Sequence, residues 1–144
     1  MSLCLAAGAV SAVLAIESFT LTWIHSIEKI RWEEDWRIEA GALVLTEARI
    51  RGTGAGMEPP AGSELRNGVW HYRPPLPPQQ ALRLTHSPHA GGYTICTPIL
   101  CSPLADHLPG IPDNAIIEAY PCKENDVSMK ANVGSIDVER SGRN

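Results

Sequence analysis

The fold is decided by two stretches of the chain, Phe19-Thr-Leu-Thr-Trp23 and Ile30-Arg-Trp-Glu-Glu-Asp-Trp-Arg-Ile38. The apolar side chains occupy odd positions in the first stretch and even positions in the second. A period of two is typical of a strand with one buried face. Because a single strand cannot change face without an extra residue or a bend, we expect a bulge or sharp turn between His25 and Lys29.

Turn signals divide the rest of the chain into short strands. Ala40-Gly41 and Asn67-Gly68 predict two hairpins, and the glycine-rich segment Arg51–Pro60 predicts a loop. Many short strands with frequent turns are typical of an all-β fold, which we expect to be a small antiparallel sandwich or a partly closed barrel. The further strands expected are Leu43–Ile50, Leu65-Arg66, Val69–Tyr72, Ala81–His86, Tyr93–Cys96 and Ala115–Tyr120, with a short strand or helical turn within Leu100–Leu108.

The size and charge of the chain limit its organisation and its partners. A length of 144 residues suits one domain with a single core. We expect this β domain to span residues 1–122, with a loosely ordered polar tail over residues 123–144. The net charge of −4 argues against a nucleic-acid partner, because phosphate binding needs a basic face. No cofactor is predicted, since the glycine-rich segment lacks the Lys-Ser/Thr of a phosphate-binding loop.

The N-terminal residues 1–16 have two interpretations. They contain no charged side chain, as the apolar region of a secretory signal would. A signal also needs a basic start, however, and the first basic residue is Lys29. The alternative, which we favour, is two strands, Ser2–Ala6 and Val10–Ile16, joined by a turn at Ala7-Gly8.

Charged residues on the first predicted hairpin are the main candidates for a binding site. If the Ala40-Gly41 turn sets a regular register, Trp36 lies opposite Leu45, Glu34 opposite Glu47 and Trp32 opposite Arg49. Glu34, Glu47 and Arg49 then share one face of the hairpin, and Arg49 lies close enough to bridge both carboxylates. A carboxylate pair among aromatic side chains tends to share a proton or to hold a cationic ligand. The alternative is a solvated ion-pair network without function. The candidate binding residues are Trp32, Glu34, Trp36, Glu47, Arg49 and, at the expected bend, His25.

Catalytic and metal sites have little support in the sequence. The one arrangement that suggests a small enzyme is His25 together with the Glu34/Glu47 pair. No nucleophile motif or metal-ligand spacing accompanies it, so we assign no catalytic residue. His86 and His89 form an H-x-x-H pair without further ligands, so no metal site is predicted. The chain also lacks the G-x-S-x-G elbow of serine hydrolases.

The four cysteines suggest two disulfides. Cys96 and Cys101 bracket a four-residue connection, which places their side chains across the mouth of a hairpin. Cys4 begins the first strand and Cys122 follows the last, and the first and last strands of a closed sheet are often neighbours. The alternative is four unpaired cysteines buried as small apolar side chains.

Several motifs in the chain resemble one bacterial family, domain of unknown function 1850. The motifs are His25-Ser-Ile-Glu-Lys-Ile-Arg-Trp-Glu-Glu-Asp-Trp36, Arg51-Gly-Thr-Gly-Ala-Gly-Met-Glu-Pro-Pro60, Trp70-His-Tyr-Arg-Pro74 and Cys101-Ser-Pro-Leu104, and the similarity extends from Cys4 to Cys122. Members of this family are commonly encoded beside the membrane permease of TAXI-type tripartite (TRAP) solute transporters. The resemblance implies a bacterial envelope protein linked to transport, although the lack of a clear signal leaves a cytoplasmic location open. It assigns no catalytic or binding residue.

Two functions from different classes follow from these observations. The first is a non-enzymatic accessory domain that binds a transported solute or docks on a transporter subunit, either the permease or the solute-binding protein. The second is a small envelope enzyme that uses His25, Glu34 and Glu47. We favour the first, and docking over solute binding, because the predicted hairpin is too shallow to enclose a ligand.

Overall fold

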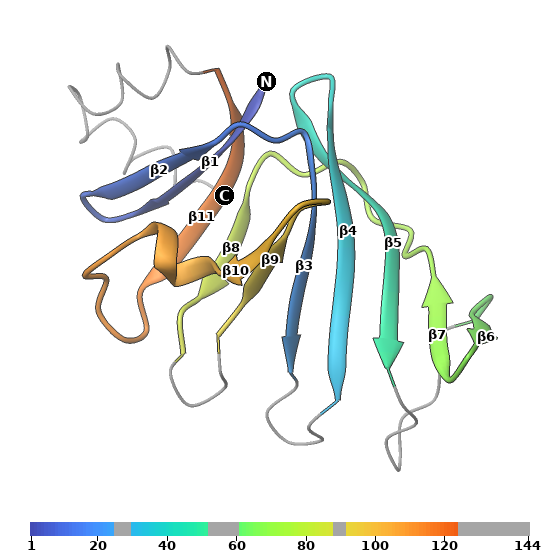
Figure 1. Ribbon diagram of the computed structural model, residues 1–144. Coiled ribbons are helices and arrows are strands. Elements are labelled where there is room, and N and C mark those ends of the chain that lie inside the picture. The colour runs from blue at the N-terminus through green and yellow to red at the C-terminus, as the bar shows by residue number, and fades with distance from the viewer. Residues whose placement is uncertain (25–29, 52–60, 88–91, 124–144) are drawn as a thin grey trace.

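The computed structural model describes residues 1–24, 30–51, 61–87 and 92–123. Two antiparallel sheets pack face to face, and they do not close into a barrel (Figure 1). The described residues contain no α-helix, only one 3-10 turn at Leu104–His107. The predicted all-β class is therefore confirmed, and of its two architectures the sandwich is present.

The smaller sheet has four strands in the order β2-β1-β11-β8. It joins the N-terminus to the end of the described chain, because β1 pairs along its length with β11. Its strands are β1 (Ser2–Ala7), β2 (Val10–Leu14), β8 (Leu82–Thr85) and β11 (Ile116–Cys122). The favoured interpretation of residues 1–16 as two strands is confirmed.

The larger sheet has seven strands in the order β10-β9-β3-β4-β5-β7-β6. Its longest strands, β3, β4 and β5, lie side by side at its centre (Figure 1). Its strands are β3 (Ser18–Ile24), β4 (Arg31–Glu39), β5 (Ala42–Arg51), β6 (Glu64–Arg66), β7 (Val69–Tyr72), β9 (Thr94–Cys96) and β10 (Cys101–Pro103). We call the face toward the four-stranded sheet the inner face and the opposite one the outer face.

The core lies between the two sheets and follows the period of two. Along β3, Phe19 and Leu21 are buried on the inner face, while Thr20 between them faces outward. The apolar side chains that meet from both sheets and from the 3-10 turn are Leu3, Leu5, Phe19, Leu21, Trp36, Leu43, Leu45, Leu84, Ile95, Leu104 and Ile117. Their burial supplies the main stabilisation of the sandwich.

Both predicted hairpin turns are present. Ala40 and Gly41 have φ angles of 50° and 77°, and Asn67 and Gly68 have φ angles of 51° and 78°. Two consecutive positive φ angles are the requirement of a two-residue turn whose twist matches the flanking strands. Three predictions fall mainly outside the described residues, namely the bend between His25 and Lys29, the loop Arg51–Pro60 and the tail over residues 123–144. Of the predicted loop only Arg51 is described, and it is the last residue of β5.

Two disulfides join the four cysteines in the predicted pairs. Cys96 and Cys101 lie directly opposite each other on β9 and β10. Cys4 on β1 is joined to Cys122 on the neighbouring strand β11. The first and last strands are neighbours as expected, but within an open four-stranded sheet and not through closure of a barrel.

Candidate functional site

The pairing of β4 with β5 contains a bulge that changes the predicted register. Next to the turn the pairing is as predicted, with Trp36 opposite Leu45. The register then shifts between Asp35 and Trp36, so Asp35 lies opposite Glu47 and Thr46 has no partner in the ladder. A bulge of this kind places two residues of one strand opposite one residue of the other and alters the phase of everything beyond it.

The shift separates residues that the sequence analysis had placed together. Glu34 lies opposite Ala48, and Trp32 lies opposite Ile50 and not opposite Arg49. Because cross-strand partners share a face, Glu34 belongs to the inner face and Arg49 to the outer face. The prediction that Glu34, Glu47 and Arg49 lie on one face is therefore wrong, and Glu34 and Glu47 cannot act as a carboxylate pair.

Arg49 instead organises three other carboxylates on the outer face, which we call the Arg49 network. Its Nη1 and Nη2 donate to Asp35 Oδ2 at 2.6 Å and Oδ1 at 2.8 Å, a bidentate pair. Its Nε donates to Glu33 Oε1 at 2.9 Å, and its Nη1 donates to Glu47 Oε1 at 2.9 Å. Only 17% of the Arg49 side chain is exposed, so the network is partly removed from water.

Neighbouring side chains complete the Arg49 network. Arg51 Nε donates to Glu33 Oε2 at 3.2 Å, and His71 Nδ1 lies 2.9 Å from Glu47 Oε1. Thr20 Oγ1 donates to Asp35 Oδ1 at 2.6 Å. Three strands, β3, β5 and β7, therefore contribute partners to the carboxylates, two of which are on β4.

Arg49 keeps the three carboxylates of the network ionised. Hydrogen bonds from Arg49 lower the pKa of Asp35 against the opposing effect of burial. Burial alone would raise the pKa of Glu33, but hydrogen bonds from Arg49 and Arg51 outweigh it and lower the pKa. Glu47 behaves in the same way, with burial opposed by hydrogen bonds from His71 and Arg49 that lower its pKa.

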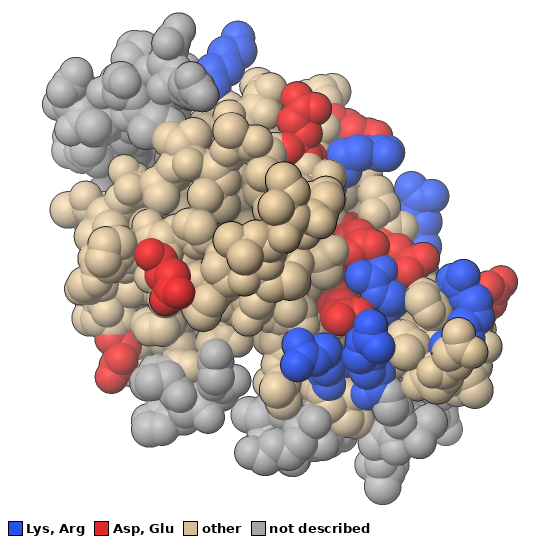
Figure 2. All heavy atoms as spheres, in the orientation of Figure 1, with Lys and Arg blue, Asp and Glu red and all other residues tan. Residues whose placement is uncertain are grey.

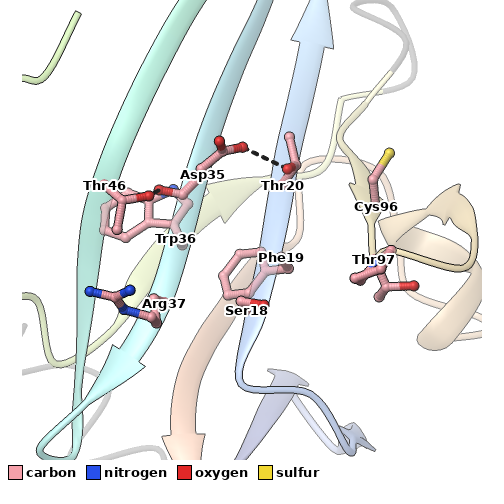
Figure 3. Close-up of a pocket in the computed structure, with 10 residues that line it drawn as sticks. Ser18, Phe19, Thr20, Asp35, Trp36, Arg37, Thr46, Cys96 and Thr97 are labelled. Carbon is pink, nitrogen blue, oxygen red and sulfur yellow. Dashed lines mark hydrogen bonds between the residues drawn. The ribbon is translucent and has the colours of Figure 1, made fainter.

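An open groove of about 460 Å³ lies beside the Arg49 network (Figure 3). Figure 3 shows Asp35 and Thr20 facing each other on β4 and β3, with Cys96 and Thr97 on the other side of β3. The polar lining of the groove consists of hydroxyl groups, one carboxylate and one guanidinium. These groups belong to Ser18, Thr20, Asp35, Arg37, Thr46 and Thr97. We call this groove the outer groove.

An exposed apolar tip lies next to the outer groove. The disulfide Cys96–Cys101 closes a short hairpin whose residues Ile99 and Leu100 are 94% and 67% exposed. The tip is ordered by Thr97, whose Oγ1 accepts hydrogen bonds from the backbone N–H groups of Ile99 and Leu100 at 3.3 and 3.1 Å. Figure 2 shows acidic and basic side chains gathered over β4, β5 and β7, with uncharged surface beside them toward β9 and β10.

Glu34 occupies a different environment on the inner face. The Trp36 indole Nε1–H donates to Glu34 Oε1 at 3.2 Å. Burial raises the pKa of Glu34, and this hydrogen bond offsets only part of the effect. Burial, and to a lesser extent the negative charge of Glu34, raise the pKa values of Tyr72 and Tyr93.

Aromatic side chains line the inner face next to Glu34. The rings of Trp23 and Trp32 stack with centroids 6.3 Å apart and planes inclined by 17°. Tyr93 packs on the other side of Trp23, at a centroid distance of 5.4 Å. Register extends this line across β5 to β7, since Ile50 pairs with both Trp32 and Trp70. We call Tyr93, Trp23, Trp32 and Trp70 the aromatic row.

The predicted site residues thus divide between two faces. Trp32, Glu34 and Trp36 share the inner face, whereas Glu47 and Arg49 share the outer face. His25 lies outside the described residues. The sequence analysis did not select Glu33, Asp35 or His71, which complete the Arg49 network. Among the described residues, no group of three or more His, Cys, Asp or Glu side chains is arranged to hold a metal ion.

The fold and these two faces define a class, an all-β sandwich with a charged outer face and an aromatic inner face. The sequence model described as "Domain of unknown function (DUF1850)" matches residues 19–104, more than half of the chain. The chain therefore belongs to the DUF1850 family, over a narrower range than the resemblance from Cys4 to Cys122 suggested. No curated protein and no solved structure matches it. Within the described residues, no helix has the length and apolar character needed to cross a membrane.

Proposed function

We propose that this protein is a non-enzymatic accessory domain of the bacterial envelope that docks on a subunit of a TRAP-type solute transporter. The contact surface is the outer face of the seven-stranded sheet. The observation that supports this surface is the proximity of the outer groove to two other features, the Arg49 network and the exposed tip at Ile99 and Leu100.

The composition of the outer face suits a protein partner. Interfaces combine apolar anchors with a polar rim, and arginine is enriched among the residues that dominate binding energy. Ile99 and Leu100 supply apolar anchors that are exposed in the isolated domain. The outer groove is open, which suits a protruding element of a partner better than full enclosure of a small solute.

The envelope location and the transporter link have separate support. Two disulfides in a small domain are typical of proteins in an oxidising compartment, which includes the bacterial periplasm. The transporter link rests on the family, whose members are commonly encoded beside TRAP permeases. Enzymatic use of the Glu34/Glu47 pair has no support, because the two carboxylates lie on opposite faces.

The docking proposal is tested by binding between purified proteins. The wild-type domain is immobilised and exposed in turn to the permease and to the solute-binding subunit of a TRAP transporter from the same organism. We expect one of them to be retained, and the double substitution Ile99→Asp with Leu100→Asp to weaken retention at least tenfold, because it places two charges in an apolar contact. Retention of neither subunit by wild-type protein would refute docking.

A matched control separates docking from general effects of surface charge. Ile116 is also apolar and 40% exposed, but it lies on β11 in the other sheet. The substitution Ile116→Asp should leave retention unchanged. Equal losses with Ile116→Asp and with the hairpin double variant would show that the outer face is not the contact surface.

A further inference from the structure

Glu34 and Glu33 have contrasting partners although they are adjacent in the chain. Glu33 receives hydrogen bonds from Arg49 and Arg51 on the outer face. Glu34 accepts a neutral hydrogen bond from Trp36, and within the described residues no lysine or arginine forms an ion pair with it. A partly buried carboxylate with no cationic partner lowers the free energy of unfolding. Proteins retain such a group mainly where its charge serves binding or catalysis.

The surroundings of Glu34 are aromatic on several sides. Trp32 precedes it by two residues on β4 and shares its face, and Trp23 stacks on Trp32. Tyr93 packs on Trp23, and Tyr72 lies one strand beyond Ala48, the partner of Glu34. These four aromatic residues are partly exposed, whereas Trp36 is buried, so solvent reaches part of this region of the inner face.

We propose that Glu34 and the aromatic row form a binding site for a small organic ammonium ion. Ring faces carry negative electrostatic potential and attract cations within about 6 Å of the centroid, most strongly for Trp. A carboxylate beside such rings adds a full charge, and its partial burial strengthens the attraction because the screening by water is reduced. Alkyl groups on the nitrogen then gain apolar contact with the indoles.

Other ligand classes fit this site less well. An anion is repelled by Glu34. A calcium or magnesium ion requires about six oxygen ligands, and the described residues here contribute one carboxylate and no cluster of further acidic or imidazole ligands. The site is distinct from the proposed docking surface, because it lies on the opposite face of the same sheet.

The inference is tested by titrating the full chain with tetramethylammonium chloride and choline chloride, using sodium chloride at equal ionic strength as the reference. All four tryptophans, Trp23, Trp32, Trp36 and Trp70, lie on the inner face, so indole fluorescence reports this region directly. We expect a saturable fluorescence change and heat of binding with both ammonium ions and only a linear drift with sodium.

Two substitutions at adjacent positions provide the decisive comparison. Glu34→Gln conserves shape and removes the charge, and it should weaken ammonium binding by about tenfold or more. Glu33→Gln makes the same change on the outer face and should leave the affinity unchanged. Trp32→Leu removes one ring face and should weaken binding by about fivefold, whereas Trp32→Phe should weaken it less.

Three results would overturn the inference. The first is the absence of a saturable signal with wild-type protein up to about 10 mM ligand, which excludes a millimolar Kd. The second is equal affinity of the Glu34→Gln and wild-type proteins, with matching near-ultraviolet circular dichroism to verify the fold. The third is equal loss in Glu33→Gln and Glu34→Gln. None of these results bears on docking at the outer face, which is measured with a different partner.

Discussion

Glu33 and Glu34 are consecutive residues whose carboxylates lie on opposite faces of the seven-stranded sheet and have pKa values displaced in opposite directions. Burial opposes ionisation of both groups. On the outer face, hydrogen bonds from Arg49 and Arg51 outweigh it for Glu33. On the inner face, the hydrogen bond from the Trp36 indole to Glu34 does not outweigh burial. This contrast allows matched substitutions at adjacent positions with opposite expected effects.

Glu34→Gln should stabilise the domain at neutral pH, by on the order of 1 kcal/mol, because it removes a partly buried charge that has no ion pair with a lysine or arginine among the described residues. The raised pKa of Glu34 means that the folded state binds a proton more readily than the unfolded state, so wild-type stability falls as pH rises through the folded pKa. The advantage of the variant should therefore be present at neutral pH and vanish below pH 4.5, the ordinary pKa. Urea unfolding across this range measures it, and a Glu34→Gln variant that is less stable than wild type at neutral pH would contradict the assignment.

Arg49→Ala should destabilise the domain at neutral pH by about 2–3 kcal/mol, somewhat less than for a fully buried ion pair. The change leaves Glu33, Asp35 and Glu47 close together without the cation that holds their pKa values down. In wild type, this stabilisation is present at neutral pH and is lost as pH falls through the lowered pKa values. The difference between variant and wild type should therefore shrink on acidification, as measured by thermal unfolding.

Arg51→Ala is the control for Arg49→Ala. Arg51 also pairs with Glu33, but its side chain is 53% exposed and makes a single contact of 3.2 Å in that pair. An exposed ion pair contributes about 0–1 kcal/mol, so this variant should remain close to wild type. Equal losses in the two variants would show that the Arg49 network acts as a set of independent surface pairs.

The fold class was predictable because its signals are local. Alternating apolar positions in Phe19–Trp23 and the positive-φ turns at Ala40-Gly41 and Asn67-Gly68 each depend on a few neighbouring residues. The choice between a sandwich and a barrel was not predictable in the same way. It depends on which strand edges pair across the whole chain, such as β1 with β11, and no local pattern specifies that pairing.

The candidate site was only partly predictable because Thr46 is an extra residue in β5 that shifts the pairing of β5 with β4. Counting from the turn placed Trp36 opposite Leu45 correctly and failed beyond the unpaired Thr46. A signal for the bulge was present, since Leu43 and Leu45 are apolar at odd positions and Ala48 and Ile50 at even ones. A phase change of this kind marks a bulge wherever both segments face one core.

The two disulfides should contribute unequally to stability. The Cys4–Cys122 bond closes a loop with a sequence separation of 118, and the Cys96–Cys101 bond one of only 5. In the chain-entropy account, their removal costs about 5 and about 2 kcal/mol respectively. Paired substitutions to serine, followed by chemical denaturation, should therefore show a much larger loss for Cys4 with Cys122. Equal losses would mean that strain or residual structure in the unfolded chain outweighs loop length.

Thr97→Val should weaken docking several-fold while leaving the stability of the domain within about 1 kcal/mol of wild type. The Thr97 hydroxyl orders the tip by accepting from the N–H groups of Ile99 and Leu100, and valine keeps the shape without the acceptor. A looser tip must then be ordered on binding, which reduces affinity without loss of contact area. Surface plasmon resonance against the retained transporter subunit measures the change. Thr85→Val, an exposed threonine on β8, is the control and should bind as wild type does. If Thr97→Val binds as tightly as wild type, the ordering of the tip before binding contributes nothing to the affinity. Ile99 and Leu100 are then ordered by the partner as it binds.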